Sequence, residues 1–211
     1  ILVCLVGSEM CIRDSLDPAD FPFMTMREAH IAGLPVRIFR ISFTGELSYE
    51  INIRARHGLA LWTHLMKAGA EFGITPYGTE AMHVLRAEKG FIIVGQETDG
   101  SVTPQDLGMD WIVSKVKPDY IGKRALERAS MAADNRKQLV GLRTKERKQV
   151  IPEGAHAVLD PNQPMPMDML GQVTSSYYSP NVGSSIAMAM LKGGRALIGG
   201  TVYLPMLDGS L

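Results

Sequence analysis

The chain has 211 residues, of which 45% are hydrophobic and 21% charged, and its 22 basic residues balance 22 acidic ones. This length allows one large domain or two small ones, and the composition is that of an ordinary globular protein. A formal net charge of zero gives no reason to expect a nucleic acid or a membrane surface as partner. No stretch approaches the roughly 20 consecutive apolar residues that a membrane helix needs.

The first 15 residues, ILVCLVGSEMCIRDS, differ in character from the rest. They have no basic segment before the apolar run and no small-residue cleavage site after it, so a secretory signal is a poor interpretation. The segment resembles a translated remnant of a sequencing adapter, and we expect residues 1–15 to be an artefact outside the fold. Cys4 and Cys11 both lie in it, so residues 16–211 hold no thiol for a disulfide, a metal site or catalysis. That absence is compatible with a cytoplasmic protein.

Residues 34–43 and 47–53 are rich in β-formers and predict a hairpin around a tight turn at 44–46. Side chains alternate along a strand, so the apolar members of the second strand share one face: Leu47, Tyr49, Ile51 and Ile53. Its polar members share the other face: Ser48, Glu50 and Asn52. Glu50 therefore lies either on a solvated face or in a polar pocket, and the pattern alone favours solvent.

Two helices are predicted next. Residues 57–72 carry apolar side chains at helical spacing, and residues 76–89 begin near a proline and end before a glycine. On the second helix one face is expected to hold Ala81, Val84, Leu85 and Glu88. Two strands followed by two helices form an α+β pattern.

The pattern then becomes irregular and later β-rich. A short strand is predicted over 91–95, a helical turn at 103–106 and a third helix over 120–129, followed by a domain boundary near residue 136. Beyond it, short β runs separated by Pro- and Gly-rich turns indicate a small barrel or sandwich. These runs are 139–142, 155–159, 171–175, 186–191 and 201–204. The last run ends in a turn signal with no strand after it, so we expect the chain to be a fragment.

Motifs for several chemistries are missing from the sequence. None of the five histidines has metal-ligand spacing, and no nucleophile elbow or dinucleotide-binding fingerprint is present. The glycine-rich run 193–200 lacks the Gly-Lys-Ser/Thr of a phosphate-binding loop and lies between β runs, so we interpret it as a turn. The sequence predicts no metal site and no catalytic nucleophile.

Three blocks in order carry a family resemblance. They are residues 40–51 (RISFTGELSYEI), residues 85–115 (beginning LRAEKGF and including GQETD) and residues 171–189 (beginning GQVTSSYYSP and ending IAMA). Together they resemble the folate-binding region shared by glycine-cleavage aminomethyltransferases (T-proteins), dimethylglycine dehydrogenases and sarcosine oxidases. The resemblance covers nearly all of residues 20–211. In detail the blocks resemble the C-terminal region of sarcosine oxidase alpha subunits.

The resemblance implies an aminomethyltransferase-like α+β folate-binding domain, partial here, over residues 16–135. A truncated small C-terminal β-barrel over residues 137–211 is implied to follow. It implies tetrahydrofolate as ligand, with the one-carbon unit from N-methyl amine oxidation captured as methylenetetrahydrofolate. For the whole enzyme it implies FAD, FMN and NAD, none with a site in this chain. The implied partners are the other subunits of a hetero-oligomeric sarcosine oxidase.

The resemblance also assigns site residues. In this family a Tyr and a Glu seven residues later contact the pterin, and here Phe43 and Glu50 hold these positions. The Glu50 carboxylate can accept the amino group and ring N–H that a pterin presents side by side. Phe43 keeps the ring and loses the hydroxyl. Arg86 and Arg195 are secondary folate-binding candidates, although the residues themselves favour an ion-pair or capping role for Arg86.

Other family positions differ or lie elsewhere. Met82 stands where many members have an arginine, and the family's Asp at the reacting amine lies upstream of this chain. The resemblance therefore implies no catalytic residue here and a fragment inactive by itself. Two alternatives stay open: a stand-alone glycine-cleavage aminomethyltransferase, and a non-catalytic folate-like binding or assembly module. The upstream sequence would distinguish the first, and a folate titration the second.

Overall fold

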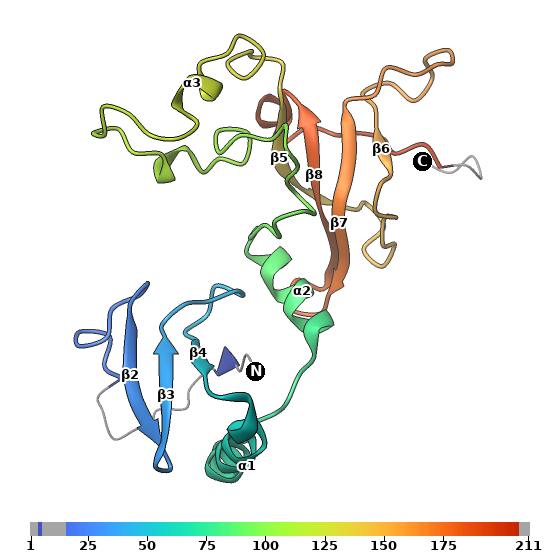
Figure 1. Cartoon of the computed structure of the whole chain (residues 1–211). Coiled ribbons are helices and arrows are strands. Elements are labelled where there is room, and N and C mark those ends of the chain that lie inside the picture. The colour runs from blue at the N-terminus through green and yellow to red at the C-terminus, as the bar shows by residue number, and fades with distance from the viewer. Residues whose placement is uncertain (1–3, 6–15, 207–211) are drawn as a thin grey trace. The chain divides into compact units, whose positions relative to one another are not determined.

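The computed structural model describes residues 4–5 and 16–206 (Figure 1). The chain forms two compact units, residues 1–82 and residues 83–211, and helix α2 (Thr79–Glu88) spans the division between them. The domain limits expected from the sequence, at residues 15 and 136, stay predictions. Cys4 and Leu5, however, belong to the segment expected outside the fold and pair with Glu50 and Tyr49. Within the described part of the chain, no helix combines the length and apolar character needed to cross a membrane.

The first unit is built on a four-stranded antiparallel sheet. Its strand order is β1 (Cys4–Leu5), β4 (Tyr49–Asn52), β3 (Leu34–Phe39), β2 (Met26–Ile31). Sequence patterns did not predict β2, which forms a tight hairpin with β3. The two turn residues, Ala32 and Gly33, have φ angles of 50° and 78°, as expected for a turn whose twist matches that of the flanking strands.

The connection between β3 and β4 is longer than predicted. β3 ends at Phe39, and residues 40–48 form a loop rather than a tight turn at 44–46. Strand alternation therefore begins only at Tyr49. Leu47 is 39% exposed in the loop, whereas Ser48 is buried and its hydroxyl donates to the Ile41 carbonyl at 3.0 Å. The expected faces were wrong for these two residues because neither belongs to the strand.

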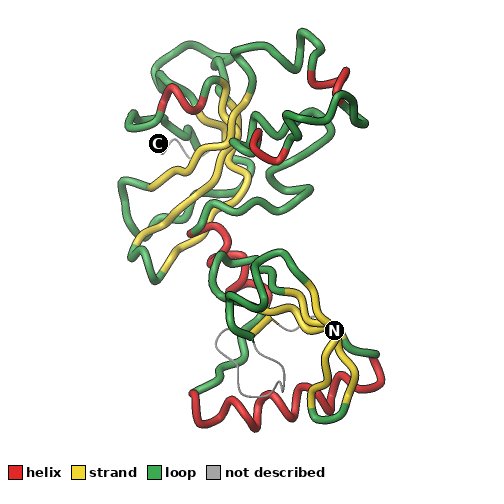
Figure 2. The backbone as a smooth tube through the Cα atoms, turned by 90° about the vertical axis from the view of Figure 1, so that its left-hand side faces the viewer, coloured by secondary structure: helices red, strands yellow, loops and turns green. Residues whose placement is uncertain are grey.

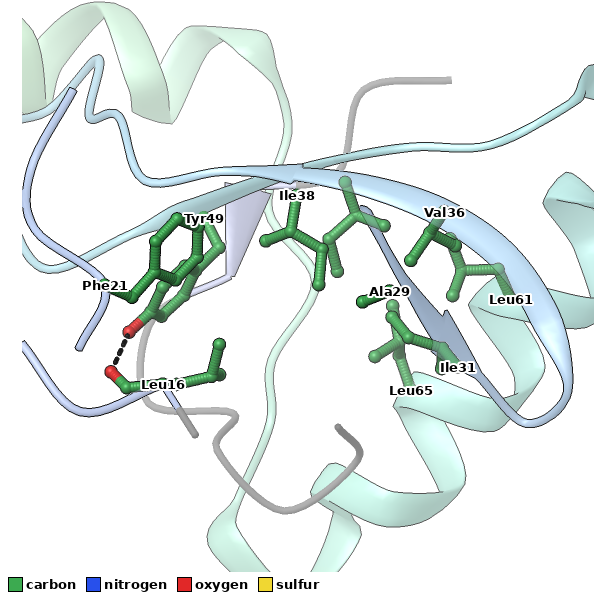
Figure 3. Packing of buried hydrophobic residues seen from close by; sticks show 10 residues of the cluster. Leu16, Phe21, Ala29, Ile31, Val36, Ile38, Tyr49, Leu61 and Leu65 are labelled. Carbon is green, nitrogen blue, oxygen red and sulfur yellow. Dashed lines mark hydrogen bonds between the residues drawn. The ribbon is translucent and has the colours of Figure 1, made fainter. Parts of the chain in front are cut away.

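Helix α1 (Gly58–Gly69) covers one face of this sheet, with short 3-10 turns at Ala55–His57 and Ala70–Phe72 on either side. The helix predicted over 57–72 is thereby confirmed. Leu61 and Leu65 of α1 pack against the apolar side chains of the strands (Figure 3). At the other end of the core, Tyr49 stacks on Phe21 with ring centroids 6.0 Å apart.

The second unit is built on a second antiparallel sheet, visible in Figure 1. Its order is β5 (Lys137–Arg143), β8 (Ser184–Lys192), β7 (Gly171–Ser179), β6 (His156–Ala157). Three of the predicted β runs are confirmed as β5, β7 and β8. The run at 155–159 shrinks to β6, and the run at 201–204 contributes only an isolated bridge between Val158 and Tyr203.

Between α2 and β5 the backbone is mostly loop (Figure 2). Two predictions there were wrong. Residues 91–95 form no strand, because local groups take up the backbone donors: Ile93 N–H donates to the Glu97 carboxylate and Phe91 N–H to the Arg86 carbonyl. The helix expected over 120–129 is only α3 (Lys123–Leu126), since Gly122 has a left-handed φ of 96° and precludes an earlier start.

The buried side chain of α2 is not one of the four that the sequence places on a common face. The expected residues are only half-buried: Ala81, Val84, Leu85 and Glu88. The buried residue of this helix is Arg86. Apolar periodicity missed it because a buried arginine looks polar in the sequence and needs partners from distant segments.

Candidate functional site

The polar face of β4 carries the principal site candidate. Tyr49 and Ile51 are each 1% exposed and belong to the core, whereas Glu50 and Asn52 are half-buried on the opposite face. The Asn52 amide donates to Glu50 Oε1 at 2.9 Å. The antiparallel register places Phe39 of β3 directly opposite Glu50, so both side chains project from the same face of the sheet. A half-buried carboxylate thus lies beside an amide donor and an aromatic ring.

The loop 40–48 supplies the other candidates of this unit. Phe43 is 37% exposed in the loop, so strand register does not bring it opposite Glu50. Glu46 is exposed in the same loop, which agrees with a turn position. Ser42 Oγ is buried and has no hydrogen-bond partner among the described residues. A buried hydroxyl without a partner is costly, and a ligand polar group would satisfy it.

These groups fit a pterin by their chemistry. The free acceptor capacity of the Glu50 carboxylate suits an adjacent amino group and ring N–H. Phe39 and Phe43 offer rings for stacking, and Ser42 offers a hydroxyl. Sequence reasoning did not identify Phe39 or Asn52 as site residues. The alternation of β4 already placed Asn52 beside Glu50, but Phe39 becomes a neighbour only through the register of β3 with β4.

Arg86 lies in the interior of the second unit and is 0% exposed. Its Nη1 contacts Glu97 Oε2 at 3.0 Å, and its Nη2 donates to Ser175 Oγ at 2.6 Å. Tyr177 Oη lies 3.2 Å from the same Nη2, and the guanidinium carbon is 5.7 Å from the centroid of the tyrosine ring. Arg86 therefore forms an interior ion pair, and a folate contact from it stays a prediction.

Glu88, two residues after Arg86 on α2, is not the ion-pair partner of Arg86. Its carboxylate accepts a hydrogen bond from Ser179 Oγ at 2.5 Å and from the Asn181 amide at 3.0 Å. Both acidic side chains, Glu88 and Glu97, thereby tie the chain near α2 to strand β7 or the turn after it. The expected ion-pair role of Arg86 is present, with a partner that the local spacing did not indicate.

Arg195 lies in the 3-10 turn Gly194–Leu197 after β8, so the turn interpretation of the glycine-rich run is confirmed. The side chain is exposed, and its Nη2 donates to the carbonyls of Gln105 and Asp106. A folate contact from Arg195 likewise stays a prediction. Within the described ranges, no cluster of three His, Cys, Asp or Glu side chains is arranged to hold a metal ion.

A second ion pair joins Asp106 to Arg136. Burial would raise the pKa of Asp106, but hydrogen bonds from Arg136 and Thr103 outweigh it and hold this pKa below its usual value. The same contact raises the pKa of Arg136. Arg136 also donates to the carbonyls of Ser130 and Ser101. The pair therefore fixes the start of β5 against the loop that precedes it.

Comparison with known proteins defines the fold class first. The glycine cleavage system aminomethyltransferase T of Bartonella henselae superposes with a TM-score of 0.74 at 26% identity, over 89% of this chain and 49% of that one. The fold is thus of the aminomethyltransferase type. The chain matches the GCVT N-terminal domain over residues 7–117 and the glycine cleavage T-protein C-terminal barrel domain over residues 137–211. It belongs to the glycine cleavage T-protein family.

Individual relatives include larger enzymes. The sarcosine oxidase alpha subunit of Corynebacterium sp. (strain P-1) is 49% identical over 191 residues, which are 88% of this chain and 19% of that subunit. The aminomethyltransferase of Halothermothrix orenii is 33% identical, over 86% of this chain and 49% of the enzyme. Rat mitochondrial dimethylglycine dehydrogenase is 34% identical, over 89% of this chain and 21% of that enzyme. The chain spans about a fifth of the sarcosine oxidase subunits it matches.

Proposed function

We propose that this chain is the tetrahydrofolate-binding C-terminal part of a sarcosine oxidase alpha subunit. The identity of 49% to a subunit of that name, against 33% to an aminomethyltransferase, supports this choice within the family. The observation that carries the binding function is the position of Glu50. It is a half-buried carboxylate on the polar face of β4, with a hydrogen-bonded amide on one side and an aromatic residue across the strand.

The proposal gives each of these residues a role. Glu50 would accept the pterin amino group and ring N–H, and Asn52 would hold the carboxylate in place from its side. Phe39 or Phe43 would stack on the pterin ring. Capture of the one-carbon unit is the chemistry that a reduced folate supplies when bound, and this chain contributes binding and orientation. FAD, FMN, NAD and the partner subunits belong to the proposal for the whole enzyme.

The test is a titration of the chain with tetrahydrofolate, comparing wild type with Glu50→Gln. We expect at least a tenfold loss of affinity, about 1.4 kcal/mol, because the amide cannot accept a charge-assisted donor pair. Glu28→Gln is the matched control, since Glu28 is an exposed strand carboxylate of the same sheet. Equal affinities for wild type and Glu50→Gln would remove Glu50 from the site.

A second pair of variants identifies the stacking ring. Phe39→Leu and Phe43→Leu each keep an apolar side chain and remove the aromatic face. Loss of one stacking contact costs about 1 kcal/mol, so roughly fivefold weaker binding is expected for the variant that removes the stacked ring. If neither wild type nor any variant binds tetrahydrofolate, the alternative of a non-catalytic assembly module gains support over the folate function.

A further inference from the structure

The second unit contains a pocket of about 390 Å³ that the folate proposal does not use. It is lined by the loop 95–102, by the start of β5 and by side chains of β7 and β8. Met190, 5% exposed, contributes an apolar surface, and Gln96, Gln172 and Thr174 contribute polar ones. This volume is in the range of small-molecule sites.

Most charges around the pocket are already compensated. Arg136 pairs with Asp106 and also donates to the backbone carbonyls of Ser130 and Ser101. Glu97 pairs with Arg86 in the interior. The lining residues Arg136, Asp106 and Glu97 therefore offer no unpaired charge to a ligand, so recognition must come from the remaining charged residues of the lining.

Two groups of opposite sign remain, Lys137 and Asp99. The Lys137 ammonium is exposed and makes no hydrogen bond or ion pair with any residue that the structure describes. Asp99 Oδ1 accepts hydrogen bonds from the hydroxyl and the backbone N–H of Ser101, at 2.6 and 2.7 Å, and these bonds lower the pKa of Asp99. The carboxylate is therefore ionised at neutral pH, and the field of Lys137 reaches it. The two groups do not meet as an ion pair.

We propose that this pocket binds a small zwitterion of the α-amino acid class, with its carboxylate at Lys137 and its ammonium at Asp99. A ligand carrying one charge would engage only one of the two groups, whereas a zwitterion engages both. The Gln172 side chain, which has no partner among the described residues, is available to either end of the ligand. The proposal is independent of folate binding, because no residue it uses belongs to the first unit.

The test is a titration of the ¹⁵N-labelled chain with glycine, followed by NMR. We expect saturable shifts of the amides of Gly95, Asp99 and Lys137, with a dissociation constant on the order of 1 mM. Acetate and methylammonium, which carry only one of the two charges, should bind at least tenfold more weakly. Lys137→Gln and Asp99→Asn should each weaken glycine binding at least tenfold.

Matched controls separate binding from folding. Lys145→Gln removes an exposed lysine just beyond β5 and should leave the glycine titration unchanged. Each variant must keep the dispersed spectrum of the wild type. The two binding variants act at opposite ends of the ligand, so if one variant fails to fold, the other still tests the proposal. Absence of shifts up to about 50 mM glycine, equal binding of acetate, or unchanged affinity in both variants would overturn the proposal.

Discussion

The interiors of the two units are filled differently. In the first unit the core is a continuous apolar cluster between the sheet and α1 (Figure 3). In the second unit an ion pair, Arg86 with Glu97, lies fully buried beside serine hydroxyls of β7, alongside a smaller apolar cluster. An apolar core tolerates approximate complementarity, whereas a buried ion pair must be satisfied group by group. The stability of the first unit therefore depends on the apolar pattern of its strands and helix, and that of the second unit on the particular residues that pair in its interior.

Removing one partner of the ion pair is the strongest test of this contrast. Glu97→Ala leaves the Arg86 guanidinium buried without its counter-charge, and we expect a loss of about 3–5 kcal/mol in the free energy of unfolding. The measurement is chemical denaturation of the chain, followed by signals from the second unit. The double variant Arg86→Met, Glu97→Leu removes both charges and should recover most of the loss. A single variant as stable as wild type would contradict the contrast.

Truncating a side chain in the apolar core of the first unit should give the second-largest loss of stability. Leu61 is 0% exposed on α1, and Leu61→Ala should cost about 3 kcal/mol through lost burial and the cavity left behind. Leu59, on the same helix, is 78% exposed, and Leu59→Ala should change stability by less than about 0.5 kcal/mol. Comparable losses in both variants, measured by denaturation, would show that the side of α1 facing the sheet has been misassigned.

The ion pair between Asp106 and Arg136 in the second unit gives the smallest effect. Asp106→Asn should cost roughly 2 kcal/mol at neutral pH, because it weakens charge-assisted bonds to Arg136 and Thr103. The pKa of Asp106 is lowered in the folded state, so its contribution is fully present above the unfolded-state pKa of about 4 and is lost as the pH falls through the lower folded value. Asp134→Asn is the exposed control.

The measurement is the free energy of unfolding of wild type and Asp106→Asn as a function of pH. The difference between wild type and Asp106→Asn should stay constant from pH 7 to about 5 and shrink below about 4. A difference that grows on acidification would mean that Asp106 is not ionised in the folded state. Asp134→Asn should follow wild type throughout.

Sequence patterns predicted the parts of the fold that depend on local periodicity. The helix 57–72 and short runs within β5, β7 and β8 were found, because their apolar spacing matches the geometry of one element. The alternation of Tyr49 and Ile51 against Glu50 was also correct. In the candidate site, the family resemblance pointed to Glu50 and Phe43, and alternation placed Asn52 beside Glu50.

The features that sequence patterns did not predict depend on partners that are distant along the chain. Arg86 is buried because Glu97, Ser175 and Tyr177 meet it, and none of these lies within a helical repeat of it. Phe39 becomes a neighbour of Glu50 only through the register of two strands. The strand expected over 91–95 failed for a related reason, since the Glu97 side chain takes up a backbone donor that a strand would present.

The register of β4 has a consequence for insertions and deletions. Tyr49 and Glu50 are adjacent on a strand whose faces alternate, so a one-residue slip would turn the carboxylate into the apolar core and the tyrosine out of it. The loop 40–48 can change in length without moving either side chain, because pairing with β3 sets their faces. An insertion or deletion within 40–48 would therefore leave Glu50 on its face but change its seven-residue spacing from Phe43, so a loop-length variant should separate the roles of these two residues.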